Sequence, residues 1–192
     1  MSPLLSLVAP CYNEARGLPA LLAAFAAAGA GRDFELILVD NGSTDDTPAV
    51  LAAELPKYPF ARSLRVEPNL GYGGGILAGL AAAGGAYRGW THADQQFPAA
   101  AAFEALERAR LLGPEAYVRG ARLGRPAPDR FFTAVLGGVY SLFLGERLRD
   151  LSGQPVVFSA GLLDGSNPPA DFSLDAVSLA LALRRGWRVE RF

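Results

Sequence analysis

The chain contains a single histidine, His92, which lies two residues before Asp94 and four before Gln96. In an extended strand, residues two positions apart point to the same side, so these three side chains would converge on one point. An imidazole, a carboxylate and an amide oxygen suit Mn²⁺ and also accept Mg²⁺. The spacing predicts a divalent-cation site, and the structural alternative is a loop histidine beside a helix-capping Asp94.

Two other polar segments also combine residue types that bind ligands. The carboxylate of Asp40, at the start of Asp40–Asp45, can accept hydrogen bonds from a nucleobase edge or from ribose hydroxyls. The alternative there is a turn with a helix cap. The glycine-rich segment Asn69–Gly75 would let a ligand approach backbone amides, or is a flexible turn. A nucleophilic Cys11 would need His92 as its base, and His92 would then not be available as a metal ligand.

Between these segments the chain alternates short and long apolar runs. The short runs predict strands at Leu4–Ala9, Phe34–Val39, Ser63–Glu67, Gly89–Ala93 and Ala116–Arg119. The longer runs predict helices at Leu18–Ala28, Pro48–Leu55, Gly73–Ala83, Pro98–Leu112 and Phe172–Arg185. This alternation predicts an α/β fold, a mostly parallel sheet with helices on both faces. Ligands of such sheets bind beyond the carboxyl ends of the strands, where the polar segments fall.

Composition restricts the class of protein. With 192 residues, 51% apolar residues and a net charge of −1, the chain has the size of one domain, and we expect residues 1–192 to form it. The balanced charge disfavours a nucleic-acid partner and favours a small molecule. One cysteine cannot form an intramolecular disulfide, and no signal-peptide pattern is evident, so we expect a cytoplasmic protein. No apolar stretch reaches the ~20 residues needed to cross a membrane.

Taken in chain order, four motifs resemble those of family-2 glycosyltransferases with the GT-A fold, in the branch of dolichyl-phosphate mannosyltransferase and related bacterial sugar transferases. The motifs are Ala9–Glu14, Val39–Asp45, Asn69–Gly71 and His92–Gln96. The resemblance implies a single Rossmann-like domain, with a nucleotide-binding half at about 1–97 and an acceptor-side half at about 98–192. It also implies that a nucleoside-diphosphate sugar, with UDP or GDP, is bound by residues of these motifs: Pro10, Tyr12, Asn13, Glu14, Asp40, Asn69 and Gly71.

The same resemblance assigns the cation to Asp94, with Gln96 at a further metal-facing position. The family usually has Asp-x-Asp, and His92 stands at the first of those positions, which removes one negative charge and weakens binding of hard Mg²⁺. A bound cation would ease departure of the diphosphate while an acceptor attacks the opposite face of the sugar, inverting the anomeric centre. Asp150 is the first candidate for an active-site carboxylate. Asp175, on a predicted helix, is the second, although it could face solvent.

Four arginines form a cationic group whose planar guanidinium groups suit phosphate. They are Arg119, Arg122, Arg125 and Arg130. We expect them to contact the acceptor phosphate or the diphosphate. The alternative is a solvated loop whose arginines pair with Asp129 and Glu146.

The apolar segment Phe131–Leu144 is too short to span a bilayer and predicts either a buried core helix or an interfacial helix on an anionic leaflet. In the second case the protein would lie at the inner face of the membrane and receive a polyprenyl phosphate. A glycan hydroxyl is the other expected acceptor, and a membrane-anchoring partner chain is a further expectation. A non-catalytic nucleotide-sugar-binding or scaffold subunit stays open, whereas a nucleotidyltransferase is disfavoured because no triphosphate-binding loop follows the first strand.

Overall fold

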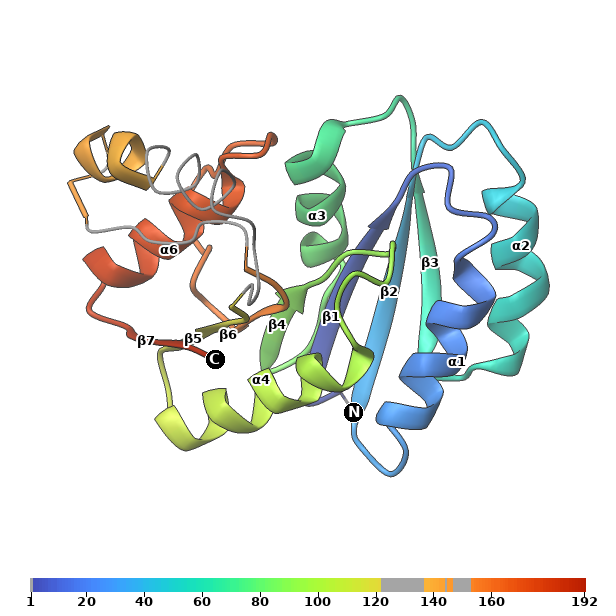
Figure 1. The fold of residues 1–192 in the computed structure, drawn as a ribbon, viewed down its shortest axis with the longest axis horizontal. Coiled ribbons are helices and arrows are strands. Elements are labelled where there is room, and N and C mark those ends of the chain that lie inside the picture. The colour runs from blue at the N-terminus through green and yellow to red at the C-terminus, as the bar shows by residue number, and fades with distance from the viewer. Residues whose placement is uncertain (1, 122–136, 144, 147–152) are drawn as a thin grey trace.

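The structure is a computed structural model that describes residues 2–121, 137–143, 145–146 and 153–192. Its centre is one seven-stranded sheet in the order β3-β2-β1-β4-β6-β5-β7 (Figure 1). The strands are β1 (Leu5–Cys11), β2 (Phe34–Asn41), β3 (Ala61–Val66), β4 (Tyr87–Trp90), β5 (Ala116–Arg119), β6 (Val156–Ser159) and β7 (Arg188–Arg191). Neighbouring strands are parallel, except that β6 runs antiparallel to both β4 and β5. The predicted α/β fold with a mostly parallel sheet is confirmed.

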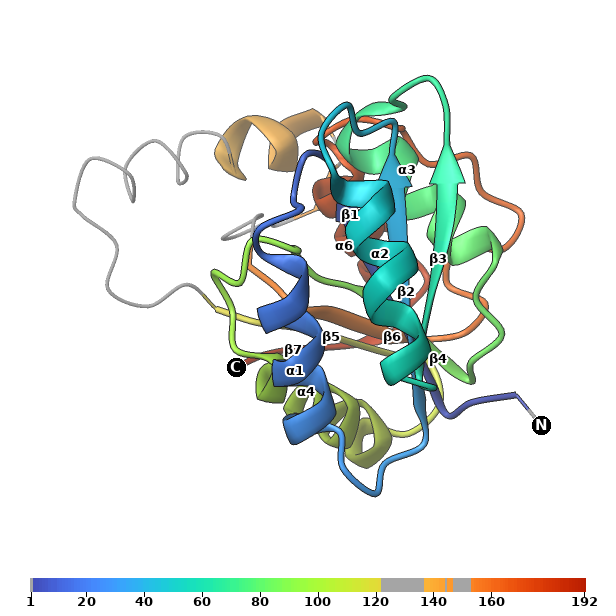
Figure 2. The ribbon, with the colours of Figure 1, turned by 90° about the vertical axis from the view of Figure 1, so that its right-hand side faces the viewer.

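Helices cover both faces of this sheet (Figure 1 and Figure 2). They are α1 (Leu18–Ala28), α2 (Thr47–Glu54), α3 (Gly71–Ala81), α4 (Ala99–Leu112) and α6 (Leu174–Arg184), with a short 3-10 helix at Leu55–Lys57. One hydrophobic core lies between the sheet and α1, α2 and α4, and a second lies between the sheet and α3 and α6. Alternate strand residues enter alternate cores, so Val118 and Val157 belong to the first core whereas Tyr117 and Val156 belong to the second.

Helix α3 is rich in glycine, a residue that lowers helix stability, and close packing explains two of its glycines. A Cβ atom at Gly79 would lie 2.4 Å from Cγ1 of Val8 in β1. A Cβ atom at Gly73 would lie 2.6 Å from the carbonyl carbon of Ala170. The segment before α6 therefore crosses directly over the first turn of α3, where the N–H of Gly74 donates to the carbonyl of Ala170 at 2.8 Å.

Most predicted elements are present with ends shifted by a few residues, and the differences concern the site. Strand β4 ends at Trp90 rather than at Ala93, so the residues that follow lie in a turn. Strands β6 (Val156–Ser159) and β7 (Arg188–Arg191) were not predicted. Of the predicted helix Phe131–Leu144, residues 137–143 are helical and the rest lies outside the described residues. Within the described ranges, no helix is long and apolar enough to cross a membrane.

Candidate functional site

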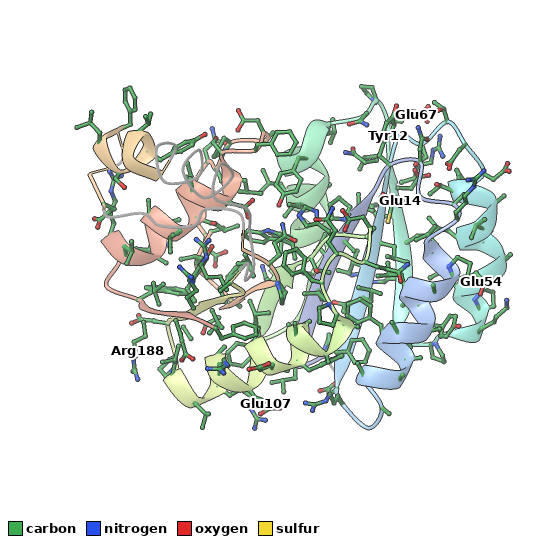
Figure 3. All side chains as sticks on the ribbon, in the orientation of Figure 1. Tyr12, Glu14, Glu54, Glu67, Glu107 and Arg188 are labelled. Carbon is green, nitrogen blue, oxygen red and sulfur yellow. The ribbon has the colours of Figure 1, made fainter. Side chains whose placement is uncertain are left out.

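The carboxyl ends of the parallel strands β1, β2 and β3 lie at one edge of the sheet, and the predicted ligand-binding segments follow them. Figure 3 shows Tyr12, Glu14 and Glu67 at this edge, whereas Glu107 lies near the opposite end of the sheet. Tyr12 is 50% exposed, and Pro10 is half-buried near the end of β1. The edge therefore presents accessible side chains beside a buried strand end.

The loops that follow β1 and β2 hold each other through hydrogen bonds. The N–H of Asn13 donates to Oγ of Ser43 at 3.0 Å, and its side-chain Oδ1 accepts the N–H of Thr44 at 2.9 Å. The N–H of Glu14 donates to Oγ1 of Thr47 at 2.9 Å. Asn13 has a φ of 58°, a left-handed conformation that asparagine tolerates better than most residues. Asn13 thus joins the two predicted nucleotide-binding loops into one rigid unit.

Asp40, the predicted base-contacting residue, is 2% exposed at the end of β2. Its Oδ1 accepts the N–H of Ser43 at 3.0 Å, and its Oδ2 pairs with Nη1 of Arg65 at 2.7 Å. Arg65 lies opposite Asp40 in the β2–β3 register, and its side chain is 43% exposed. The guanidinium of Arg65 is therefore more accessible to a ligand than the carboxylate. Sequence reasoning missed Arg65, because the register that pairs the two residues cannot be inferred from β3 alone.

Asn41 fixes the third loop, which contains the predicted residues Asn69 and Gly71. Its Oδ1 accepts the N–H of Leu70 at 2.9 Å, and its Nδ2 donates to the carbonyl of Gly71 at 2.9 Å. Oδ1 of Asn69 also accepts the N–H of Gly71, at 2.8 Å, and Gly71 has a φ of 74°. A buried asparagine at the end of β2 therefore holds the exposed residues 69–71 against the strand ends, whereas Gly73, Gly74 and Gly75 of the predicted glycine-rich segment are buried in α3.

His92, Asp94 and Gln96 do not continue β4 as an extended strand, so the predicted reason for their convergence is wrong. The cause is a tight turn, in which Oδ1 of Asp94 accepts the N–H of Gln96 at 3.1 Å and Gln95 has a φ of 59°. Asp94 also does not cap α4, which begins at Ala99 after an N-cap at Pro98. The side chains of Asp94 and Gln96 are exposed, and His92 is half-buried.

Neighbouring groups position this turn. Nε2 of Gln95 donates to the carbonyl of Gly17 at 2.9 Å and so ties the turn to the loop after β1. The His92 ring packs against two aromatic rings, with its centroid 5.8 Å from that of Tyr72 and 6.1 Å from that of Phe97. The imidazole is therefore held by packing at a fixed place on the edge of the sheet.

Acidic groups gather where the loop after β1 meets the turn after β4. Burial, followed by the negative charges of Asp94 and Asp45, raises the pKa of Glu14 above its ordinary value. Within the described part of the chain, no three His, Cys, Asp or Glu side chains are arranged to hold a metal ion. A cation here would take few protein ligands and the rest from a diphosphate and water, which is how Mg²⁺ usually binds beside phosphates. His92 and Asp94, which are accessible and adjacent to an acidic group, fit a cation of that kind.

Asp175 is buried rather than solvent-facing, with 8% of the residue exposed. Its Oδ1 accepts Nε1–H of Trp90 at 3.0 Å, and its Oδ2 accepts the hydroxyl proton of Tyr72 at 3.0 Å. Gln154 in turn donates Nε2–H to the Tyr72 oxygen at 2.5 Å. Tyr72 also stacks on Phe172, which is 79% exposed, with ring centroids 4.9 Å apart. Sequence reasoning missed Tyr72 and Gln154 as site residues, because the fold alone brings them to Asp175.

Of the four predicted arginines, the structure places Arg119, at the end of β5 with 2% of the residue exposed. The other three and the predicted carboxylate lie outside the described residues: Arg122, Arg125, Arg130 and Asp150. Cys11 is fully buried, and its Sγ–H donates to the carbonyl of Ala9 at 3.4 Å. Burial, followed by the charges of Glu14 and Asp40, raises the pKa of the Cys11 thiol, which excludes the alternative of a nucleophilic cysteine.

Comparison with known proteins identifies the family. The model of glycosyl transferase family 2 matches residues 6–155, which include all of the ordered motifs. Undecaprenyl-phosphate 4-deoxy-4-formamido-L-arabinose transferase of Pseudomonas syringae is 42% identical over 79 residues, which cover 39% of this chain and 23% of that protein. Dolichyl-phosphate beta-glucosyltransferase of Dictyostelium discoideum is 32% identical over 92 residues, which cover 43% of this chain and 28% of that protein. These alignments span less than a third of either relative.

The fold has close counterparts among solved structures. Glucosyl-3-phosphoglycerate synthase from Mycobacterium tuberculosis, in complex with Mn²⁺, UDP and phosphoglyceric acid, superposes with a TM-score of 0.76. The superposition covers 98% of this chain and 68% of that chain at 23% sequence identity. The predicted GT-A fold is confirmed by this likeness, and the predicted family by the sequence match. The chain therefore belongs to glycosyl transferase family 2.

Proposed function

We propose that this protein transfers a sugar from a nucleoside-diphosphate sugar, with UDP or GDP, to an acceptor, with inversion of the anomeric centre. The observation that carries the proposal is the joining of three loops at one edge of the sheet, where Asn13 and Asn41 hold the motifs that follow β1, β2 and β3. Family membership supports the reaction class. UDP is present in the superposed glucosyl-3-phosphoglycerate synthase, which supports a nucleotide donor.

In this proposal the nucleotide lies over the joined loops. The exposed ring of Tyr12 provides a surface for the base, and Pro10, Asn13, Glu14 and Asp40 line the same pocket. Asn69 and Gly71 border it from the side of α3. Since the Asp40 carboxylate is already paired, we expect the exposed edge of Arg65 to contact the base or the ribose in its place.

We propose that His92, Asp94 and Gln96 hold a divalent cation, Mn²⁺ or Mg²⁺, at the adjacent turn. When bound, the cation supplies positive charge that stabilises the diphosphate as it leaves. An imidazole ligand in place of a carboxylate favours Mn²⁺ over Mg²⁺. The presence of Mn²⁺ in the superposed synthase supports a divalent cation.

The acceptor is expected on the other side of the sugar, towards β5 and β6. A polyprenyl phosphate is the favoured acceptor, because the names of two relatives specify undecaprenyl or dolichyl phosphate. An anionic phosphate needs positioning rather than deprotonation, which suits Arg119 and the arginines that follow it: Arg122, Arg125 and Arg130. A glycan hydroxyl would need a general base. Both oxygens of Asp175 already accept hydrogen bonds, so we assign that role to Asp150 and a positioning role to Asp175.

We further propose peripheral contact with the inner face of the membrane, alone or through a membrane-anchoring partner chain. Leu142 and Phe143, in the helical residues 137–143, are 83% and 80% exposed. Figure 1 shows this helix at the outside of the molecule, beside α6. Large exposed apolar side chains on a short helix are typical of interfacial segments.

A non-catalytic nucleotide-sugar-binding subunit is the alternative, and His92 in place of an acidic residue favours it. Calorimetric titration with UDP, GDP and their sugar conjugates, each with Mn²⁺, Mg²⁺ or a chelator, determines whether the protein binds a nucleotide donor and whether that binding needs a metal ion. Sugar transfer to a short polyprenyl phosphate then separates an enzyme from a scaffold. We expect Asp94→Ala to abolish transfer while the circular dichroism spectrum is unchanged, and His92→Asp to shift the metal preference towards Mg²⁺. Full activity of Asp94→Ala would refute the assignment of the cation.

A further inference from the structure

Two buried polar side chains next to the proposed site have atoms without hydrogen-bond partners. Arg119 and Gln154 are each 2% exposed. Nε and Nη2 of Arg119 and Oε1 of Gln154 are buried and accept or donate no hydrogen bond. Because more than nine in ten buried polar groups in proteins are paired, two adjacent exceptions require an explanation.

The two residues lie together on one face of the sheet. Arg119 ends β5 and is opposite Val156 of β6, two residues after Gln154. Strand alternation places Arg119 on the same side as Tyr117, which belongs to the core beneath α6. A Cβ atom at Gly153 would lie 3.4 Å from Nη2 of Arg119, so the residue before Gln154 borders the guanidinium.

Hydrogen-bond chemistry determines which atom of Gln154 is free. The Tyr72 hydroxyl has one proton, which it donates to Asp175, so towards Gln154 it can only accept. The amide nitrogen of Gln154 must therefore point at Tyr72, and its oxygen is left as an unused acceptor. Oε1 of Gln154 therefore needs a ligand group that donates a hydrogen bond, such as a hydroxyl.

The free nitrogens of Arg119, in contrast, are hydrogen-bond donors and need an acceptor. Nε and Nη2 form one edge of the planar guanidinium, and two parallel N–H bonds from such an edge match the two oxygens of a carboxylate or phosphate. Within the described residues, Arg119 takes part in no ion pair. A buried cation without a partner destabilises a fold, so a purely structural role does not explain the residue.

We propose that Arg119 and Gln154 form a subsite for an oxyanion that carries an adjacent hydroxyl, that is, a hydroxy-carboxylate or a phosphate monoester of a polyol. Arg119 binds the anionic oxygens through Nε and Nη2, and Oε1 of Gln154 accepts the hydroxyl proton. This subsite rests on the proposed function in one respect, namely that its ligand is part of either the transferred sugar or the acceptor. If the ligand is the acceptor, the subsite favours a small polar acid over the polyprenyl phosphate named above, because a polyprenyl chain carries no hydroxyl beside its phosphate. If the ligand is the transferred sugar, the polyprenyl phosphate remains the acceptor.

Calorimetry with defined probes tests the subsite and separates the two sources. D-glycerate and glycerol 3-phosphate represent an acceptor, and UDP-glucuronate compared with UDP-glucose, both with Mn²⁺, represents an acidic sugar. We expect the protein to bind one free probe, or to prefer UDP-glucuronate, and Arg119→Met to weaken that binding by at least about tenfold. Gln154→Met should weaken it as well. If the protein binds UDP but shows neither effect, the subsite is refuted and the proposed donor binding stands.

A matched control comes from the same sheet. Arg88 in β4 lies opposite Phe158, at the far end of the second-core face, and its Nε is also buried without a partner. Arg88→Met should leave probe binding unchanged, and an equal loss in both variants would overturn the proposal.

Thermal stability provides an independent readout, because an Arg119 that is paired only when a ligand is bound destabilises the free protein. Arg119→Met should raise Tm without ligand, whereas a structural arginine would lower it. Probe binding through Arg119 in a protein that binds no UDP would support the subsite and refute the proposed function.

Discussion

Asp175→Ala should destabilise the protein strongly, because this aspartate is the shared acceptor of two donors beneath α6. Trp90 and Tyr72 each donate to a different carboxylate oxygen at 3.0 Å, and the aspartate is 8% exposed. A hydrogen bond to a charged group contributes about 1.5–3 kcal/mol, and a buried donor left unpaired adds its own desolvation cost. Asp175→Ala removes two such bonds, and the donors that remain buried are neutral, so we expect a loss of about 3–4 kcal/mol in the free energy of unfolding.

Urea unfolding followed by circular dichroism measures this loss. Asp175→Asn should cost less, about 1–2 kcal/mol, since the amide keeps one acceptor oxygen and the side-chain volume. Asp171→Ala is the matched control, because among the described residues this exposed carboxylate bonds only to nearby Ser173, and we expect a change below about 1 kcal/mol. If Asp175→Ala unfolds within about 1 kcal/mol of the unmodified protein at an unchanged m-value, the reasoning is refuted.

Three further predictions concern the edge of the sheet. Cys11 should react with a thiol reagent at neutral pH only as the protein unfolds, since burial raises its pKa, and rapid labelling of the folded protein would contradict its burial. Gly73→Ala should cost about 2 kcal/mol or more in urea unfolding, because its Cβ would meet backbone at 2.6 Å, whereas Gly84→Ala, with no atom closer than 3.9 Å, should not. The raised pKa of Glu14 means that the folded state binds its proton more tightly than the unfolded chain, so this carboxyl lowers stability increasingly as pH rises above about 4. The gain in urea midpoint from Glu14→Gln should therefore grow between pH 4 and pH 7, and a constant or falling gain would contradict the assignment.

The local pattern of this chain was sufficient for its fold class and for the position of its ligand edge. Apolar runs of two lengths, separated by polar and glycine-rich segments, predicted the alternating strands and helices and placed the segments after β1, β2 and β4 at one edge. The ordered motifs predicted the family, which the match over residues 6–155 confirms. These properties are local or additive along the chain, so they can be inferred before any long-range contact is known.

Long-range pairing decided the rest. The β2–β3 register pairs Asp40 with Arg65. A turn rather than a strand presents His92 and Asp94, because the pairing of β4 with β1 and β6 stops at Trp90. The short antiparallel strand β6 brings Gln154 to Arg119, although 34 intervening positions separate them in the sequence. Asp175 likewise meets Trp90 and Tyr72 only because α6, β4 and α3 pack on the same face of the sheet. Burial and hydrogen-bond pairing depend on which distant segments meet, and tertiary packing alone determines that.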